Sequence, residues 1–417
     1  MAPRVAIVGS GFAGLNAARS LAGKPVDVLL IDQYNYHLFQ PLLYQVATAG
    51  LEPEEIAYPV RRILRKAPNV EFRMALVQGV DLAGRELHTD GGPIPYDYLI
   101  VAAGSDNNFF GNDDLERHAY GLKDLQQAER LRNHVLACFE RAAALPPSPE
   151  RQALLTFVIG GGGPTGVEFA GALSELVSLV LEHDFRGRMA RQEVRLILIE
   201  GGPDLLGTFH PRSRRAAFRE LRSKGIEVRL SQRIQDYDGS TVTIVDGSTI
   251  AARTLMWAAG VRAARLAEAF GLPLARGARL AVTPALQLPD HPEVYVVGDM
   301  AYLEQGGRLL PQLAPVAIQQ GQTAAENILR HTLGIPPRRF RYRDKGTLAT
   351  IGRNAAVAEF GPIRLRGFVA WVMWLAVHIV MLIGFRNRIV VLVDWAWNYF
   401  SYDRALRLIT RREGEGP

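Results

Sequence analysis

The sequence predicts an α/β protein made of two glycine-rich units and a helical C-terminal region. Two segments, one at the N-terminus and one near residue 160, repeat the order apolar strand, glycine loop, helix, apolar strand and acidic residue. The third observation is an apolar stretch at 368–385 that contains no Asp, Glu, Lys or Arg. With 417 residues, 48% of them hydrophobic, the chain can form two or three domains, each with its own core.

The first unit has a G-x-G-x-x-G loop directly after the apolar run at 5–8. Gly9 permits a tight turn, Gly11 lets a pyrophosphate approach the backbone, and Gly14 lets the next helix pack closely on the strand. Asp32 ends the second strand, 23 positions after Gly9, where a carboxylate can accept a hydrogen bond from a ribose hydroxyl. The alternative is a glycine-rich turn in an unrelated α/β fold. Because the strand, the three glycines, the helix, the second strand and the acid follow one another at the expected spacing, the sequence predicts a Rossmann-type dinucleotide site.

Two segments follow Asp32 before the next strands. Residues 34–48 are rich in aromatic and amide side chains and predict a loop that enters a short helix. This segment could pack over a flat cofactor or could be a partly buried connection. Residues 52–66 predict one helix, with Ile56 and Val60 on its inner face.

The second unit repeats the motif at Gly161, Gly163 and Gly166, and Glu200 ends its second strand. The interval from Gly161 to Glu200 is 39 residues, longer than the usual interval of about 20, so we expect an insertion between the helix and the strand. A carboxylate at Glu200 accepts a hydrogen bond from a ribose 2′-hydroxyl and repels a 2′-phosphate. No Arg lies between Glu200 and Phe209, so the sequence favours NADH over NADPH.

A protein that binds two dinucleotides usually holds one as a resident flavin, so we assign FAD to the N-terminal unit. A strand starting at 292 ends at Gly298 and Asp299, where the aspartate could bind the ribityl chain of FAD; a common turn is the alternative. The strand that ends at Gly260 mirrors the one that ends at Gly104, and we expect Gly260 near the nicotinamide cofactor. The expected domains are 1–115 with 285–335 for FAD, 116–284 for NADH, and 336–417 for a separate C-terminal region.

The chain contains one cysteine, Cys138, within a helix predicted over 121–144. A single cysteine excludes an intrachain disulfide, a CxxC pair and a four-cysteine iron–sulfur site. The electron acceptor must therefore meet the flavin directly or be a diffusible partner. The single cysteine also fits a reducing compartment. No metal site is expected, and the short segment before the first strand leaves no room for a signal peptide. The net charge of +6, with arginines near the C-terminus, favours an anionic surface over nucleic acid.

The apolar stretch at 368–385 is followed by a pattern typical of a helix at a membrane interface. Eighteen uncharged residues are the lower limit for a spanning helix, and His378 is polar in their middle. At helical spacing, one face would carry Leu392, Trp395, Tyr399, Tyr402, Leu406 and Ile409, and another would carry Arg404, Arg407 and Arg411. These faces suit the lipid interface and anionic lipid phosphates. We expect monotopic insertion; the alternatives are a spanning helix, or a core helix followed by a dimer interface.

Six short motifs, spread over the whole chain, resemble one family of flavoproteins. They are H-x-F-x-P-L-L-Y-Q at 37–45, G-G-G-P-T-G-V-E at 161–168, W-A-A-G at 257–260, G-D at 298–299, Y-x-D-K-G at 342–346 and I-G-R at 351–353. The chain resembles the type II NADH dehydrogenases, single-subunit NADH:quinone oxidoreductases that do not pump protons. The resemblance implies two Rossmann domains with FAD, NADH on one face of the flavin and ubiquinone or menaquinone on the other. It also implies a homodimer, bound peripherally to the cytoplasmic face of the cell membrane.

The resemblance further implies roles for three side chains. Glu168 matches the family glutamate near the flavin where nicotinamide docks, although an acid in the first turn of a helix is the alternative reading. Lys345 matches the family lysine near the quinone entrance. Gln319 is kept from the quinone-side motif Ala-Gln-x-Ala-x-Gln, but Pro315 replaces the first Gln and removes both an amide and a backbone N–H.

The site residues expected from these motifs fall into three sets. The catalytic set is Glu168, Gln319 and Lys345. The FAD set is Gly9, Gly11, Phe12, Ala13, Gly14, Asp32, Ala103, Gly104, Gly298, Asp299 and Ala317. The NADH set is Gly161, Gly163, Thr165, Gly166, Glu168, Glu200 and Gly260. Two other functions stay open: a soluble NADH-dependent ferredoxin-type reductase, and a redox-sensing flavoprotein similar to the apoptosis-inducing factors.

Overall fold

The computed structural model describes residues 2–185, 187–401 and 407–410 and divides into two compact units. Unit 1 comprises Met1–Leu38, Ala57–Asp106 and Val261–Lys345, and unit 2 comprises Phe39–Ile56, Asn107–Gly260 and Gly346–Pro417. Both units are discontinuous in sequence. The domain boundaries expected at 115 and 284 stay a prediction, and the compact units change over at 106 and 260.

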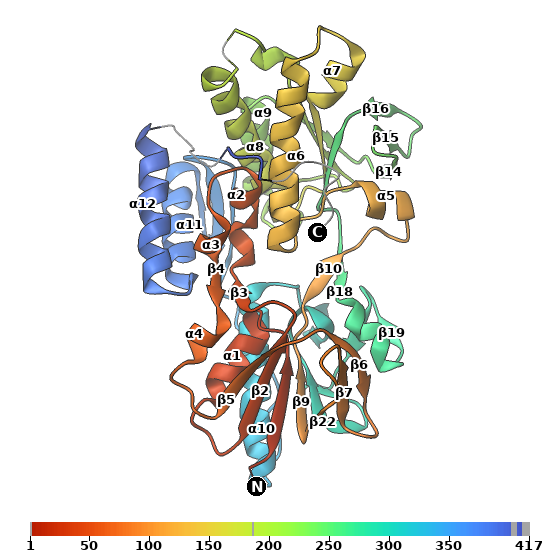
Figure 1. Cartoon of the computed structure of the whole chain (residues 1–417), viewed down its shortest axis with the longest axis vertical. Helices are drawn as coiled ribbons and strands as arrows, with labels where there is room; N and C mark the ends of the chain where they lie inside the picture. Colours follow the sequence, from red (N-terminus) through yellow and green to blue (C-terminus); the bar gives the residue numbers. More distant parts are fainter. Residues whose placement is uncertain (1, 186, 402–406, 411–417) are drawn as a thin grey trace. The chain divides into compact units, whose positions relative to one another are not determined.

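Unit 1 is built on a six-stranded sheet (Figure 1). Its strands are, in spatial order, β21 (Gln287–Leu288), β22 (His291–Val296), β9 (Tyr98–Val101), β1 (Arg4–Val8), β2 (Asp27–Asp32) and β5 (Val70–Met74). All neighbours pair in parallel except β21. Parallel strands are covered on both faces and need nearly continuous apolar sequence, as the fully buried residues of β1 illustrate.

The remaining elements of unit 1 are short strands and helices around this sheet. They are α1 (Phe12–Leu21), β3 (Tyr36–Leu38), β4 (Ala57–Pro59), α4 (Val60–Leu64), β6 (Val77–Asp81), β7 (Glu86–Thr89), β8 (Ile94–Pro95), the linking strands β10 (Ser105–Asn107) and β18 (Val261–Ala263), η3 (Arg265–Phe270), β19 (Leu274–Ala275), β20 (Arg279–Ala281), η4 (Gly298–Met300), β23 (Ala301–Tyr302), β24 (Glu304–Gln305), β25 (Arg308–Leu309) and α10 (Ala314–Thr332). Helices α1 and α10 pack together, and a Cβ atom at Gly321 would lie 2.2 Å from the carbonyl oxygen of Ala13. This close packing places the first turn of α1 against the middle of α10.

Unit 2 is built on a four-stranded parallel sheet, with strands β13 (Ile226–Leu230), β12 (Arg195–Glu200), β11 (Thr156–Gly160) and β17 (Thr254–Trp257) in spatial order. Its other elements before the C-terminal region are η1 (Gln40–Leu42), α2 (Leu43–Ala47), α3 (Pro53–Ile56), α5 (Asp113–His118), α6 (Leu125–Ala143), α7 (Pro149–Leu154), α8 (Pro164–His183), η2 (Arg191–Glu193), α9 (Pro211–Ser223), β14 (Ile234–Tyr237), β15 (Thr241–Ile244) and β16 (Thr249–Ala251). The last three strands form an antiparallel meander.

The C-terminal region of unit 2 forms a second small layer. Strands β26 (Thr347–Thr350), β27 (Ala356–Phe360) and β28 (Ile363–Arg366) are antiparallel, and α11 (Gly367–Met381) packs on all three. Helix α12 (Phe385–Ser401) contacts α11 and α3, and Figure 1 shows α11 and α12 side by side.

The prediction of a single helix over 52–66 is wrong, because the middle of this segment forms a strand. The chain forms α3, then the strand β4, which pairs with β3, and then α4. Pro59 has no N–H and restricts Tyr58 to extended geometry, so a continuous helix cannot pass through this point. Ile56 and Val60 are nevertheless buried, as their apolar character predicted.

Candidate active site

The first glycine loop joins β1 to α1 in unit 1. A Cβ atom at Gly9, whose φ is +100°, would lie 2.3 Å from the carbonyl oxygen of Ala102, and one at Gly14 would lie 1.8 Å from that of Gly9. The fold itself therefore requires these two glycines. At Gly11, no heavy atom of the described chain beyond its neighbours lies within 4 Å of the same position. Gly11 faces open space, as a glycine approached by a pyrophosphate should.

Asp32 ends β2 beside this loop, and its carboxylate accepts three hydrogen bonds. Oδ2 accepts from the N–H and the hydroxyl of Ser10, at 2.6 and 2.8 Å, and Oδ1 accepts from the N–H of Tyr34 at 2.8 Å. Burial raises the pKa of Asp32, and the hydrogen bonds partly offset this effect. The acid is thus fixed at the loop in the position that reads a ribose hydroxyl. Ser10 was missed because the motif leaves its position open.

The predicted FAD residues of α1, η4 and α10 come together in unit 1. A Cβ atom at Gly298, whose φ is +68°, would lie 3.4 Å from the Cβ of Ala317 and 3.5 Å from that of Ala13. Phe12, the residue before Ala13, begins α1 and is partly exposed. The N–H of Gly298 donates to Oε1 of the buried Gln320 at 2.6 Å. Gln320 was not predicted, because the quinone-side motif pointed to the neighbouring Gln319.

Asp299 is linked to the segment that follows β9. Its Oδ2 accepts a hydrogen bond from the hydroxyl of Ser105 at 2.6 Å, and its carbonyl oxygen accepts one from the amide of Gln312 at 3.1 Å. Gly104, whose φ is +78°, directly precedes Ser105 and follows Ala103. The Ser105 hydroxyl thus links the segment that follows Ala103 and Gly104 to Asp299.

The second glycine loop, between β11 and α8 of unit 2, repeats the first in detail. A Cβ atom at Gly161, whose φ is +108°, would lie 2.5 Å from the carbonyl oxygen of Ala258, and one at Gly166 would lie 1.9 Å from that of Gly161. At Gly163 the equivalent position is open, with no heavy atom of residues 2–185, 187–401 or 407–410 beyond its neighbours within 4 Å. Thr165 is exposed in the first turn of α8.

Glu200 ends β12 and corresponds to Asp32 of unit 1. Its Oε2 accepts a hydrogen bond from the N–H of Gly162, and its Oε1 accepts one from the N–H of Gly202, each at 2.6 Å. Both oxygens are therefore held by backbone groups, and each keeps a lone pair for a further donor. This geometry can present the carboxylate to a ribose.

Gly260 lies against the ring of Phe110, because a Cβ atom at this glycine would lie 2.8 Å from Cζ of that ring. The N–H of Asn108 donates to the carbonyl oxygen of Gly260 at 3.1 Å, and the carbonyl oxygen of Asn108 accepts from the indole of Trp257 at 2.9 Å. Two hydrogen bonds thus hold the segment before Phe110 to the end of β17.

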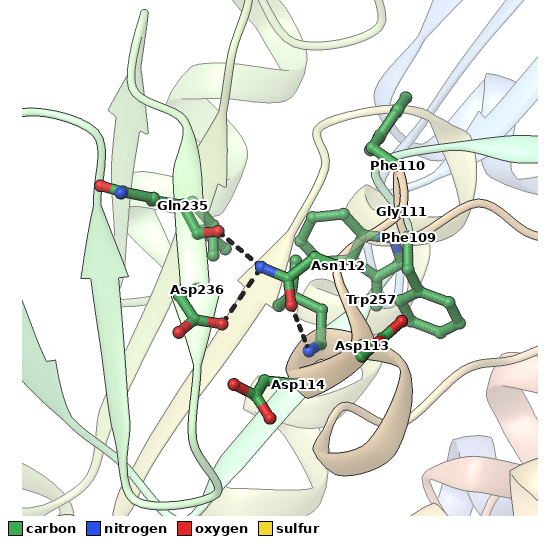
Figure 2. Close-up of a pocket in the computed structure, with 11 residues that line it drawn as sticks. Phe109, Phe110, Gly111, Asn112, Asp113, Asp114, Gln235, Asp236 and Trp257 are labelled. Atoms are coloured by element: carbon green, nitrogen blue, oxygen red, sulfur yellow. Dashed lines mark hydrogen bonds between the residues drawn. The ribbon is translucent and has the colours of Figure 1, made fainter.

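A cavity of about 460 Å³ opens beside this segment. Figure 2 shows the aromatic side chains of Phe109, Phe110 and Trp257 on one side of it, and Gln235 and Asp236 on the other. The amide of Asn112 donates to the carbonyl oxygen of Gln235 at 3.0 Å and to the carboxylate of Asp236 at 3.1 Å. The cavity was not predicted, because its walls come from segments more than 100 residues apart.

Glu168 lies on α8 and is buried, with its carboxylate toward the C-terminal layer. Its Oε1 accepts a hydrogen bond from the N–H of Thr350 at 3.2 Å. Burial raises the pKa of Glu168 to about 8, and this hydrogen bond offsets the shift only in part. The side chain is therefore mostly neutral at pH 7. A solvated acid stabilised by the helix dipole would not be buried in this way.

Gln319 and Lys345 both belong to unit 1. The Gln319 amide donates to the carbonyl oxygen of Arg343 and accepts from the N–H of the same residue, both at 3.0 Å. Gln305 makes the same pair of bonds with Tyr342, at 3.3 and 2.8 Å. The two amides hold the extended segment that leads to Lys345, which is exposed. A ligand that bound the Gln319 amide would have to replace these bonds.

The C-terminal layer contains an aromatic cluster on its inner side. The imidazole of His378 stacks on the indole of Trp374 with ring centroids 3.9 Å apart, and its Nδ1–H donates to the Trp374 carbonyl oxygen at 2.7 Å. Burial lowers the pKa of His378 to about 4, so the ring is neutral. The Trp395 indole donates to Oε1 of Gln45 at 2.8 Å. Nδ1 of His378 and Nε1 of Trp395 are thus bound within the protein.

The outer side of the C-terminal layer is apolar, but its residues differ from those predicted. Helix α12 exposes Ile389, Leu392, Val393 and Trp397, and α11 exposes Phe368, Val369, Val372, Met373 and Val380. Of the predicted face, only Leu392 belongs to this set, because Trp395 bonds to Gln45 and the ring of Tyr399 lies under the guanidinium of Arg353. None of the helices formed by the described residues is long and apolar enough to cross a bilayer.

The predicted continuation of the helix to residue 411 is also wrong in part. Helix α12 ends at Ser401, and residues 407–410 are not helical, so Ile409 does not continue a helical face. Arg407 pairs with Asp184 at 2.7 Å instead of standing free. The predicted positions Tyr402, Arg404, Leu406 and Arg411 lie outside the described residues.

Two family models match this chain, one over the segment with the two glycine loops and one over the C-terminal region. Residues 3–321 match the model of the pyridine nucleotide-disulphide oxidoreductase family, and residues 345–401 match that of the NDH2 C-terminal domain. The fold is similar to the structure of NDH2 from Plasmodium falciparum in complex with NADH, with a TM-score of 0.88, 21% identity and coverage of 99% of this chain and 100% of that one.

Two curated relatives come from Mycobacterium tuberculosis, and both are type II NADH:quinone oxidoreductases. One is 40% identical over 98% of this chain and 91% of its own length, and the other is 39% identical over 98% of this chain and 89% of its own length. The chain therefore belongs to the pyridine nucleotide-disulphide oxidoreductase family and, within it, to the type II NADH:quinone oxidoreductases.

Proposed function

We propose that the protein transfers two electrons from NADH through bound FAD to a quinone without pumping protons. The balanced reaction is NADH, one proton and quinone giving NAD⁺ and quinol. One observation carries the proposal: two glycine loops that each have a middle glycine facing open space and an acid fixed beside it. Two such loops in one chain fit one resident and one exchanging dinucleotide.

Unit 1 supplies the groups that would hold FAD. The open position at Gly11 and the start of α1 suit the pyrophosphate, and Asp32 suits the adenosine ribose. The other proposed contacts are Gly9, Phe12, Ala13, Gly14, Ala103, Gly104, Gly298, Asp299 and Ala317. When bound, FAD supplies the redox chemistry by accepting two electrons from NADH and giving them to the quinone.

Unit 2 supplies the groups that would hold NADH. Gly163 and the start of α8 suit its pyrophosphate, and the fixed carboxylate of Glu200 suits the 2′-hydroxyl of its adenosine ribose. The other proposed contacts are Gly161, Thr165, Gly166, Glu168 and Gly260. Because the Glu200 carboxylate is bound to two backbone N–H groups, it cannot move aside for a 2′-phosphate without losing both bonds.

Three side chains are proposed to act in the electron transfer. Glu168 is mostly neutral at pH 7 and would contact the nicotinamide as an uncharged acid. Lys345 is exposed and would stabilise negative charge that develops on the quinol oxygens. Gln319 would orient a quinone carbonyl after exchanging its bonds with Arg343.

We propose that the apolar surface of α11 and α12 binds the membrane peripherally, at its cytoplasmic face, and that the protein is a homodimer. The exposed aromatic and aliphatic side chains, Trp397 among them, suit insertion at headgroup level. Such a surface would give a lipid-soluble quinone a direct route to the protein. The dimer rests on the family resemblance.

The test is a steady-state assay of the purified FAD-loaded protein. It should oxidise NADH in the presence of a water-soluble quinone and produce quinol. Ferredoxin as the acceptor serves as the comparison. Turnover with ferredoxin but with no quinone would contradict the proposal, and slow turnover with every acceptor, with dimerisation induced by NADH, would favour a redox sensor.

A further inference from the structure

An arginine from another part of the chain lies beside the loop that follows Glu200. A Cβ atom at Gly201 would lie 3.1 Å from Cγ and 3.4 Å from Nε of Arg233. Arg233 belongs to the connection between β13 and β14, so the absence of arginines directly after Glu200 did not exclude a cation here.

The backbone fixes this arginine next to the acid. The N–H of Gln232 donates to the carbonyl oxygen of Glu200 at 3.1 Å, and the N–H of Ser231 donates to that of Gly202 at 2.9 Å. The carbonyl oxygen of Arg233 itself accepts a hydrogen bond from the N–H of Val245 at 2.9 Å. Arg233 is thus held from both sides at the carboxyl edge of the parallel sheet, where such sheets bind nucleotides.

The guanidinium of Arg233 is exposed and has no ion pair or side-chain hydrogen bond within the described part of the chain. Two other arginines of unit 2 have acidic partners: Arg214 pairs with Asp204 at 3.1 Å, and Arg229 pairs with Glu227 at 2.7 Å. An unpaired guanidinium suits an aromatic base, on which it can stack, or a phosphate, which it can bind with two N–H groups.

We propose that Arg233 contacts the adenosine part of the nicotinamide cofactor and forms half of a latent 2′-phosphate site. In Rossmann-type sites the acid at the end of the second strand binds the 2′-hydroxyl, and a nearby arginine accommodates a 2′-phosphate. This protein has both groups side by side. Glu200 alone then excludes NADPH, while Arg233 binds adenosine in NADH and is already placed to bind the 2′-phosphate if the carboxylate is removed. The inference rests on the proposed NADH site of unit 2.

The test measures equilibrium binding of adenosine 2′,5′-bisphosphate and of 5′-AMP to the FAD-loaded protein by calorimetry. Glu200→Ala should tighten binding of the bisphosphate roughly 10- to 100-fold, since a charged hydrogen-bonded pair replaces a repulsion. The double variant Glu200→Ala with Arg233→Ala should lose most of this gain. Arg65→Ala, which removes one exposed arginine of unit 1, is the matched charge control. It should change the affinity neither for the bisphosphate nor for 5′-AMP.

Activity gives a second readout with the same variants. The ratio of kcat/KM for NADPH to that for NADH should rise in Glu200→Ala and fall back in the double variant. If the double variant binds the bisphosphate as tightly as Glu200→Ala does, the role of Arg233 is refuted. If instead no variant oxidises NADH with a quinone, the proposed reaction fails, and the binding data still decide whether Arg233 lies in the adenosine site.

Discussion

The Glu168 carboxylate on α8 accepts a hydrogen bond from the backbone N–H of Thr350 on β26, at 3.2 Å. This bond joins the helix of the second glycine loop to the C-terminal sheet. The backbones also meet closely, because a Cβ atom at Gly171 of α8 would lie 2.7 Å from the nitrogen of Gly352. The contact removes Glu168 from water and so couples its protonation to folding.

Replacing Glu168 by Gln should change the pH dependence of stability. The pKa of Glu168 is about 8 in the folded protein and near its ordinary value of 4.5 when unfolded. Between these values the unfolded chain ionises and the folded one does not, so this group lowers the stability of the parent protein as pH rises from about 5 to about 8. The Tm of Glu168→Gln minus that of the parent should therefore increase over this range.

Thermal unfolding in a pH series measures this difference directly. Glu175→Gln, on the same helix, is a suitable control, because Glu175 pairs with Lys224 at 3.3 Å and is only partly buried. Parallel curves of Tm against pH for Glu168→Gln and the parent would show that Glu168 is not a buried neutral acid.

The glycines of the first loop should respond differently to alanine. Gly14→Ala places a Cβ atom against the carbonyl oxygen of Gly9 and should cost about 3 kcal/mol or more of folding free energy, with or without FAD. Gly11→Ala has room in the protein and should change the stability of the FAD-free protein by less than about 1 kcal/mol. Because its methyl group occupies the proposed path of the pyrophosphate, the same variant should lose FAD.

Denaturant unfolding of the FAD-free proteins measures the folding free energy, and the flavin content of the purified proteins measures FAD retention. An FAD content of Gly11→Ala equal to that of the parent would place the pyrophosphate elsewhere.

Two tryptophans of α12 should separate membrane binding from folding. Trp397 is 66% exposed, so Trp397→Glu should reduce binding to vesicles of phosphatidylglycerol and phosphatidylcholine, with a change in stability within about 0.5 kcal/mol. Trp395→Phe loses the hydrogen bond to Gln45 and should cost about 1 kcal/mol of stability while vesicle binding is kept. Cosedimentation with vesicles and thermal unfolding measure the two effects. Equal vesicle binding by Trp397→Glu and the parent would refute membrane docking through this surface.

Features governed by local geometry could be predicted from the sequence. Gly9 and Gly161 have positive φ at the turn after their strand, and Gly14 and Gly166 pack against the carbonyl oxygens of Gly9 and Gly161 in the same loop. The spacing of these four glycines alone indicates both loops. The same reasoning located Asp32 and Glu200 at the ends of their second strands, despite the longer interval before Glu200.

Features that depend on distant segments could not be predicted in this way. Helical spacing grouped Leu392, Trp395 and Tyr399 on one face, but amphipathic spacing does not tell which aromatic side chains pack on protein and which face outward. Arg233 reaches the Glu200 loop from a different strand connection. The burial of Glu168 depends on Thr350, which lies 182 residues later in the chain.

The central claim is that electrons pass from NADH to a flavin and then to a quinone, and an anaerobic two-step titration tests it most directly. One equivalent of NADH, added to the FAD-loaded protein, should bleach the visible flavin absorbance. One equivalent of a soluble quinone, added next, should restore the absorbance and yield one equivalent of quinol. A flavin that NADH does not reduce, or that stays reduced after quinone is added, would contradict the account.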